Sequence, residues 1–320
     1  MSRACYVREE FYKMVEDAIN NDKPLYCIGF YFPDISDIKV DLKFTKPVYF
    51  SYARFQQANF KATEFQQQAD FSYAEFGEVD FININFPNNY KGENNKPHIN
   101  KDIPIKFNYS TFRGRARFIG KNDNEPLDLS NVSLKGVALD NVEFHNVKWR
   151  EDRVLRFIKR NVVVDELIMD VMNNYQEVSR IYNRLRKNYE MQLLFNEALH
   201  FFIGEMEAIR RSLSKKGMSG ILESIPYLLY KYIALYGENV FLPLVVWTPV
   251  MIIGFAILRT LDGMCYDYNC VIEHVIDSIA AYFQVPRDPQ RALDIIERIL
   301  AVPILGSAFI AIKRRFEGRK

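Results

Sequence analysis

Residues 50–86 read FSYARFQQANFKATEFQQQADFSYAEFGEVDFININF. Phenylalanines recur in this stretch at intervals of five, in two runs of four with one extra residue between the runs. The positions are Phe50, Phe55, Phe60, Phe65, Phe71, Phe76, Phe81 and Phe86. A period of five fits neither an amphipathic helix, which repeats every 3.6 residues or so, nor a flat strand, which alternates. The stretch therefore predicts a repeating unit of five residues.

The same spacing continues further along the chain. Phe107 and Phe112 resume it, and the series closes with Leu129, Leu134, Leu139, Phe144 and Trp149. The residue two positions before an anchor is usually small or apolar, as in Ala58, Ala74 and Val142. Because residues two apart on an extended chain face the same side, each unit sends one small and one large side chain inward. These residues predict a solenoid whose core is a column of phenylalanines, which explains why the chain has 25 of them.

Several units also carry a recognisable signature. The stretches Ala58-Asn59-Phe60, Ala69-Asp70-Phe71 and Ala74-Glu75-Phe76 resemble the A-(D/N)-(L/F)-x-x signature of pentapeptide-repeat proteins. The resemblance covers about residues 44–86 and 107–149. It implies a β-solenoid of the right-handed quadrilateral pentapeptide-repeat β-helix type, in which four units make one coil.

Two kinds of departure from the repeat are visible. Six-residue steps from Phe44 to Phe50 and from Phe65 to Phe71 predict bulges, and residues 87–106, rich in Asn and Lys, predict a protruding insertion loop. Exposed solenoid ends recruit other chains unless they are capped. Residues 1–43 are therefore expected to form an N-terminal cap region, with an amphipathic helix from Arg8 to Asn21, ahead of the solenoid at 44–149.

Residues 150–235 predict a helical linker domain. Within it, Tyr175, Val178, Tyr182, Leu185 and Tyr189 form a short apolar seam of barely two heptads. That seam leaves two readings open, packing within the chain or self-association. Glu205 and Glu207 are two residues apart, so they do not share a helix face, and we expect them to be solvated.

Residues 236–320 predict a membrane hairpin with spans at about 240–259 and 293–312. Val240–Leu258 carries no charged residue and is long enough to cross a bilayer. The second apolar run reaches spanning length only if Asp294, Glu297 and Arg298 lie near the outer interface. Buried core helices of a soluble protein are the alternative for both segments.

Charges around the two apolar segments predict their orientation. Basic residues precede the first and follow the second, whereas residues 260–292 hold five acidic and two basic residues. The positive-inside rule then places both termini and the solenoid in the cytoplasm, with the protein in the cell membrane. Cys265 and Cys270 would be extracytoplasmic and could pair as a disulfide; unpaired thiols are an equal alternative.

The tail resembles that of microbial pentapeptide-repeat proteins with an ion-channel-like C-terminal part. The resemblance implies a pore helix at Val275–Phe283, a hinge at Gly306 and a two-span pore. No glycine occurs between Gly263 and Gly306, so a glycine-rich potassium filter is absent from the sequence. Glu297 is the candidate intramembrane carboxylate, and an interfacial residue beside Arg298 is the preferred alternative.

Other function classes find no support in the residues. The sequence has no phosphate loop, no nucleophile elbow, no paired Cys motif and no His–Glu metal helix, so we expect no enzyme, catalytic residue, cofactor or metal. Residues 44–86 carry three basic and five acidic residues, and residues 107–149 carry six and five. This near balance, like the overall net charge of +2, predicts no nucleic-acid partner and no mimicry of a phosphate backbone.

Together these features predict a membrane-anchored, non-enzymatic interaction or scaffold protein with a cytoplasmic solenoid. Its expected partners are the lipid bilayer and either other proteins or further copies of itself. The alternative is a two-span ion-channel-like protein that the solenoid regulates.

Overall fold

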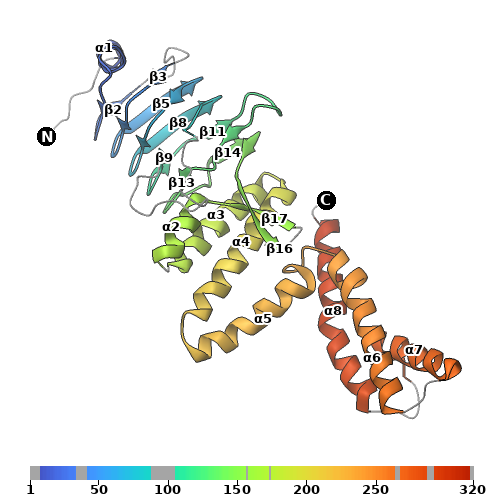
Figure 1. Cartoon of the computed structure of the whole chain (residues 1–320). Helices are drawn as coiled ribbons and strands as arrows, with labels where there is room; N and C mark the ends of the chain where they lie inside the picture. Colours follow the sequence, from blue (N-terminus) through green and yellow to red (C-terminus); the bar gives the residue numbers. More distant parts are fainter. Residues whose placement is uncertain are drawn as a thin grey trace. The chain divides into compact units, whose positions relative to one another are not determined.

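The computed structural model describes residues 8–33, 42–87, 105–155, 158–172, 174–263, 267–286 and 292–317. The chain divides into two compact units, Met1–Ser212 and Leu213–Lys320. Figure 1 shows both along the chain, and each is described by itself below.

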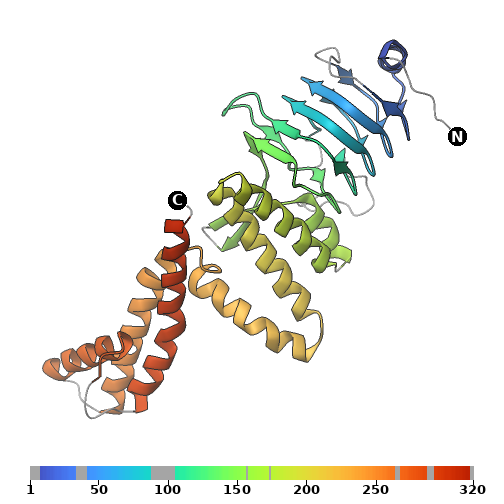
Figure 2. The ribbon, with the colours of Figure 1, turned by 180° about the vertical axis from the view of Figure 1, so that it is seen from behind.

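Short strands that pair in parallel from coil to coil build the first unit (Figures 1 and 2). One sheet holds β1 (Leu25–Tyr26), β4 (Val48–Tyr49), β7 (Ala69–Asp70), β9 (Ile105–Lys106) and β13 (Val132–Ser133) in that order. A second holds β2 (Tyr31–Phe32), β5 (Arg54–Lys61), β8 (Glu75–Ile82), β11 (Ala116–Ile119) and β14 (Val142–His145), with β10 (Thr111–Phe112) also on β8. Two further pairs are β3 (Lys43–Phe44) with β6 (Glu64–Phe65), and β12 (Leu127–Asp128) with β15 (Val147–Lys148). The predicted β-solenoid is thus confirmed.

The inward side chains stack into four columns that run along the solenoid. One column is Cys27, Phe50, Phe71, Phe107 and Leu134; the second is Phe32, Phe55, Phe76, Phe112 and Leu139; the third is Phe60, Phe81, Phe118 and Phe144; the fourth is Phe44, Phe65, Phe86, Leu129 and Trp149. All of these residues are buried. Neighbouring rings lie nearly parallel, with 5.0 Å between the centroids of Phe55 and Phe76 and 5.2 Å between those of Phe60 and Phe81. The high aromatic content therefore serves core packing.

The two regular coils repeat after 21 residues, as the register of Phe44 on Phe65 and Phe55 on Phe76 shows. The extra residue of each six-residue step lies in the connection from β3 to β4 or from β6 to β7, outside the strands. These steps therefore lengthen a corner and do not form the expected bulges, because a corner residue has no inward position to keep. The interruption after Phe86 falls at the same corner; residues 88–104 of that predicted loop lie outside the described part of the chain.

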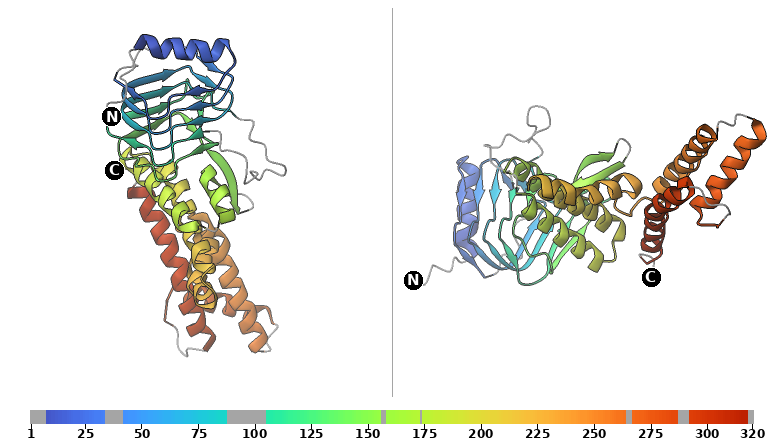
Figure 3. Two further views of the ribbon diagram at one scale, coloured as in Figure 1. Left: turned by 90° about the vertical axis from the view of Figure 1, so that its left-hand side faces the viewer. Right: turned by 90° about the horizontal axis from the view of Figure 1, so that it is seen from below.

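The solenoid begins earlier than residue 44. Strands β1 and β2 already pair with the next coil, and Cys27 occupies a column position beside Phe50. Helix α1 (Arg8–Asn20) lies across this end (Figure 3). It buries Phe11, Val15 and Ala18, and the Phe11 ring meets the Phe32 ring edge-on with the centroids 5.0 Å apart.

Helices cover the other end of the solenoid. The antiparallel pair β16 (Arg150–Leu155) and β17 (Ile158–Val162) leads into α2 (Val164–Met172), α3 (Tyr175–Met191) and α4 (Phe195–Ser214). The apolar seam of α3 is buried. Tyr189 stacks on Phe144 with 5.7 Å between ring centroids, and the Asn188 side-chain amide donates to the carbonyl oxygens of Leu139 and Val142 at 2.7 and 2.6 Å. The seam packs within the chain, which was one of its two readings.

Glu205 and Glu207 differ from expectation, because both are buried and not solvated. Each has an arginine partner of its own: Arg186 Nε donates to Glu205 at 3.0 Å, and Arg210 Nη2 donates to Glu207 at 2.6 Å. The two-residue spacing places the carboxylates on different faces of α4, and a separate guanidinium compensates each one.

The second unit is helical. It contains α5 (Met218–Ala234), the π-helical segment η2 (Leu242–Trp247), α6 (Thr248–Asp262), α7 (Tyr268–Tyr282) and α8 (Ala292–Glu317). By length and composition, Leu242–Asp262 and Ala292–Arg314 are each sufficient to cross a membrane. Helix α5 groups with these two segments, whereas the sequence analysis assigned it to the linker domain.

Candidate functional site

Outside the solenoid, charged side chains pair between neighbouring coils. Arg54 and Arg113 both approach Glu75, at 3.5 and 2.9 Å, and Arg117 pairs with Asp80. Arg115 forms a two-pronged hydrogen bond with Glu143, which lowers the pKa of that carboxyl. Because basic and acidic residues alternate across coils, this face presents a nearly neutral, ordered polar surface.

A tyrosine ladder forms one exposed corner of the solenoid. Tyr52, Tyr73 and Tyr109 stack with ring centroids 4.8 and 5.2 Å apart. All three have a left-handed backbone, with φ between 58° and 60°. Gly136 holds the same corner in the next coil with φ of 71°, and a Cβ there would lie 2.3 Å from Tyr109 Cδ1. The ladder exposes flat aromatic rings and offers no acid, base or nucleophile.

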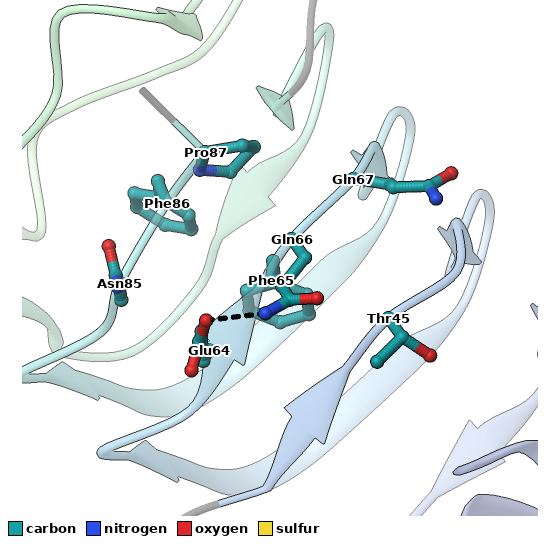
Figure 4. A pocket seen from close by; sticks show the side chains of 8 residues that line it. All are labelled: Thr45, Glu64, Phe65, Gln66, Gln67, Asn85, Phe86 and Pro87. Atoms are coloured by element: carbon teal, nitrogen blue, oxygen red, sulfur yellow. Dashed lines mark hydrogen bonds between the residues drawn. The ribbon is translucent and has the colours of Figure 1, made fainter. Parts of the chain in front are cut away.

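Figure 4 shows a hollow on another side of the solenoid. Its lining residues are Thr45, Glu64, Phe65, Gln66, Gln67, Asn85, Phe86 and Pro87. Gln66 Nε2 donates to Glu64 Oε1 at 2.9 Å, and this bond together with Lys43 lowers the pKa of Glu64. The hollow offers side-chain amides and one carboxylate that is paired with Lys43. These groups suit hydrogen bonding to a peptide, but none of them activates a substrate.

Buried charges in the helical end of the first unit have structural partners. Arg160 donates to both Glu166 oxygens, at 2.6 and 2.8 Å, and to Tyr182 Oη at 3.0 Å. Burial raises the pKa of Asp165 to about 6, although hydrogen bonds from Ser133 Oγ and the Leu134 amide oppose the shift. These groups fasten the capping helices to the last coil.

A second buried polar cluster lies in the helical hairpin, where α6, α7 and α8 meet. Arg259 Nη2 donates to Asp294 Oδ1 at 2.6 Å and to Glu297 Oε2 at 2.7 Å. Ser278 Oγ from α7 donates to Glu297 Oε1 at 2.5 Å. The side chains of Arg259 and Glu297 are fully buried. The cluster ties the adjoining ends of the two candidate spans to each other and to α7.

Glu297 therefore lies in the interior of the hairpin, and its depth in a membrane stays a prediction. The guanidinium of Arg298 instead donates to the Val285 carbonyl oxygen at 2.7 Å. Gly306 is exposed on α8, the helix runs through it without a break, and a Cβ there would contact nothing within 4 Å. Cys270 is disulfide-bonded. Its predicted partner Cys265 lies outside the described residues, so that pairing stays a prediction.

The predicted pore helix is part of α7, which packs on α6 and α8. Ile276 and Ile279 on α7, and Phe283 directly after it, are exposed. At the opposite end of the hairpin, Arg314 pairs with Glu238 at 2.7 Å and donates to the Tyr236 carbonyl oxygen at 3.2 Å. In the described part of the chain, no group of three or more His, Cys, Asp or Glu side chains is placed to hold a metal ion.

One family model matches part of the chain. Residues 43–86 match pentapeptide repeats (9 copies). No curated protein and no solved structure matches this chain. The pentapeptide repeats coincide with the two regular 21-residue coils, and the less regular coils on either side extend the same columns.

Sequence reasoning missed Phe118, Cys27 and the partner of Glu297. Phe118 follows Phe112 after six residues, and Cys27 replaces a phenylalanine, so neither fits a strict period of five. Arg259 had a detectable signal, because it ends one apolar segment while Asp294 and Glu297 begin the other. Opposite charges at the adjoining ends of two antiparallel helices predict a pair between them.

Proposed function

We propose that this protein is a membrane-anchored, non-enzymatic scaffold whose pentapeptide-repeat solenoid presents a rigid surface to partner proteins in the cytoplasm. The observation that carries the proposal is the low burial of the two candidate spans. Only 17% of the first apolar window and 33% of the second is buried within the chain. A core helix of a soluble protein would be mostly buried.

The side chains that these helices leave uncovered are large and apolar. Val250, Ile253 and Ile257 on α6 and Ile299, Val302 and Phe309 on α8 are all exposed. Contiguous apolar surfaces of this size mark interaction with lipid or with another protein. Arg259 and Glu297, by contrast, are buried and pair with each other inside the hairpin, as charged groups in a hydrocarbon environment usually do.

The orientation follows from charge and redox chemistry. Basic residues flank the pair of spans, and the connecting segment is acidic, which favours cytoplasmic ends. A disulfide at Cys270 also fits an oxidising compartment on the far side of the membrane. The buried Cys27, in contrast, is a free thiol in the solenoid core.

The scaffold role rests on the sides of the solenoid. Helix α1 covers one end and α2–α4 the other, so partner proteins have access to the lateral faces. Those faces carry the tyrosine ladder, the paired charges and the polar hollow, which suit protein recognition. Among the described residues, we find no group of side chains arranged for catalysis.

Membrane extraction tests the anchor. The full chain is expected in the membrane fraction and to stay there after alkaline carbonate washing, whereas a chain that ends at Ser212 is expected in the supernatant. A reporter enzyme that is active only outside the cytoplasm should be active when it is fused at Gly263. Release of the full chain by carbonate, or a cytoplasmic reporter at Gly263, contradicts the proposal.

The rival function is a channel-like pore. The presence of the helix α7 in the segment that connects the two candidate spans favours it. However, Glu297 is neutralised by Arg259 within the same chain, which leaves it no role facing a shared pore. Two-span subunits form a pore only as oligomers, so a monomer in mild detergent excludes the channel. Ion flux in bilayers that Glu297→Gln abolishes would overturn our preference for a scaffold.

A further inference from the structure

Helix α5 exposes its apolar face, which a helix of a soluble protein would bury. Its exposed large side chains are Ile221, Leu222, Ile225, Leu228, Leu229 and Tyr232, with Leu222 62% and Leu229 56% exposed. Their spacing of three and four residues places them on one stripe of the helix. Nothing in the described residues of the chain covers this stripe.

The opposite face of α5 is small or polar, and it is buried. Gly220 packs so closely that a Cβ there would lie 2.1 Å from the Leu213 carbonyl oxygen. Ser224 and Ala234 are also buried. An amphipathic helix of a soluble protein buries its apolar stripe. Helix α5 does the opposite: it exposes its apolar stripe and buries its small and polar side chains.

The C-terminal end of α5 is fixed at the level where the candidate spans begin and end. Trp247 Nε1, in η2, donates to the Tyr232 carbonyl oxygen at 2.9 Å. Arg314, near the end of α8, donates to the Tyr236 carbonyl oxygen just beyond α5. From this point α5 runs away from α6 and α8 at an angle to them and not alongside them (Figures 1 and 2). A helix at this level and in this direction lies in the plane of a bilayer surface.

Charge and aromatic content agree with a lipid surface. Lys215 and Lys216 immediately precede α5 and are exposed. Tyr227, Tyr230 and Tyr232 lie in its second half, toward the spans. Lysines complement anionic headgroups, and tyrosines concentrate at the boundary between headgroups and acyl chains.

We infer that α5 is an interfacial membrane helix, with its apolar stripe in the acyl–headgroup boundary of the cytoplasmic leaflet and Lys215 and Lys216 on anionic lipid headgroups. The exposed lysines before α5 and the tyrosines in its second half select lipid and not a second copy as the occupant of the stripe. This inference rests on the proposed membrane anchor. It adds a third membrane-contacting element that lies on the bilayer without crossing it.

Cysteine labelling in nanodiscs tests the inference with neighbouring residues as controls. The full chain, with Cys5→Ser, is placed at one copy per disc containing anionic lipid, and a membrane-impermeant maleimide is added. Leu222→Cys probes the stripe, Glu223→Cys probes the adjacent exposed face, and Ile253→Cys probes the first span. Because only a hydrated thiolate reacts, we expect Leu222→Cys to react about tenfold more slowly than Glu223→Cys. Replacing Lys215 and Lys216 by Gln is expected to raise the Leu222→Cys rate.

The outcomes separate this inference from the proposed function. Equal rates at Leu222→Cys and Glu223→Cys, with Ile253→Cys still protected, overturn the interfacial helix and leave the anchor intact. Protection of Leu222→Cys that appears only when a disc holds two copies overturns it in favour of a contact between copies. Fast labelling of Ile253→Cys contradicts the membrane anchor itself.

Discussion

At the scale of single residues, the solenoid depends on backbone conformations that the sequence does not announce. Tyr52, Tyr73 and Tyr109 have left-handed φ values, which bulky residues rarely adopt. Their stacked rings compensate for the strain. A tyrosine every 21 residues is too sparse a pattern to predict this corner, because only the coil length, once known, aligns Tyr52 with Tyr73.

Substitution of Gly136 tests how closely the last ring of the tyrosine ladder, Tyr109, packs on the next coil. Gly136→Ala is expected to lower the free energy of unfolding by more than the strain of about 1–2 kcal/mol for a left-handed alanine. The added Cβ meets the Tyr109 ring, so the loss should shrink when Tyr109→Ala is present. Chemical denaturation of the single and double variants measures this; equal losses in both backgrounds would show that the ring plays no part.

Asp165 makes stability depend on pH. Its pKa is about 6 in the folded chain because of burial, against about 3.9 in an unfolded chain. The folded state therefore holds a proton that the unfolded state releases, so this stabilisation is complete below about pH 4 and is lost as the pH rises through about 6. At most it amounts to about 3 kcal/mol.

The variant Asp165→Asn removes that titration. The difference in unfolding free energy between the parent and Asp165→Asn should fall between about pH 4 and 6 and stay constant above 7. Trp149 fluorescence in a Trp247→Phe background reports unfolding of the first unit alone, since the chain has two tryptophans. A difference that stays constant from pH 4 to 8 would refute the assignment.

Arg259 carries the hairpin cluster. Arg259→Gln leaves the buried Glu297 and the partly buried Asp294 without their cation, and the expected loss of stability is about 3–5 kcal/mol. Asp294→Asn and Glu297→Gln added to it should restore most of that loss. Thermal unfolding in detergent is the measurement, with Arg314→Gln as the control, because Arg314 is 40% exposed and its pair is worth far less. Equal effects of Arg259→Gln and Arg314→Gln would contradict the prediction.

At the scale of elements, the sequence was most informative where its period was strict. The phenylalanine runs from Phe50 to Phe86 predicted the solenoid and its inward residues, because each five-residue unit makes one side of the coil. It was least informative where the period slipped. Residues 25–32 contain the strands β1 and β2. Only one phenylalanine in this segment, Phe32, lies in a column, so the sequence predicts a cap there and not a coil.

The column and the ladder respond differently to truncation. Phe71 is fully buried and its ring lies 5.2 and 4.9 Å from those of Phe50 and Phe107. Phe71→Ala is expected to cost about 3–5 kcal/mol. Tyr73→Ala, two residues away on the exposed ladder, should cost about 1 kcal/mol. Guanidinium unfolding followed at Trp149 distinguishes the two, and similar costs would mean that the columns do not dominate the core.

At the scale of the whole molecule, sequence patterns predicted the order of the parts better than their boundaries. The predicted helical linker domain, residues 150–235, includes α5, whose apolar stripe has normal helical spacing. Spacing alone cannot say which face is covered. Burial of Gly220 and Ser224 decides that, and it follows from tertiary contacts that no local pattern encodes.

The division at Ser212 gives a prediction for a shortened chain. A chain of residues 1–212 keeps all four columns and both sets of capping helices, so it should fold without detergent. Its circular dichroism and its Trp149 emission are expected to match those of the first unit in the full chain. Aggregation of this fragment under conditions where the full chain is stable in detergent would show that the two units depend on each other.

The 21-residue coil also limits how the chain can gain or lose length. Removing residues 45–65 deletes one complete turn, and every remaining ring meets a ring of the same column. Removing twenty residues from the same place shifts all later side chains by one, which turns the phenylalanines outward and buries the charged neighbours. Viable changes in the length of this part of the solenoid therefore come in whole turns, in steps of about 4.8 Å, the spacing of neighbouring strands.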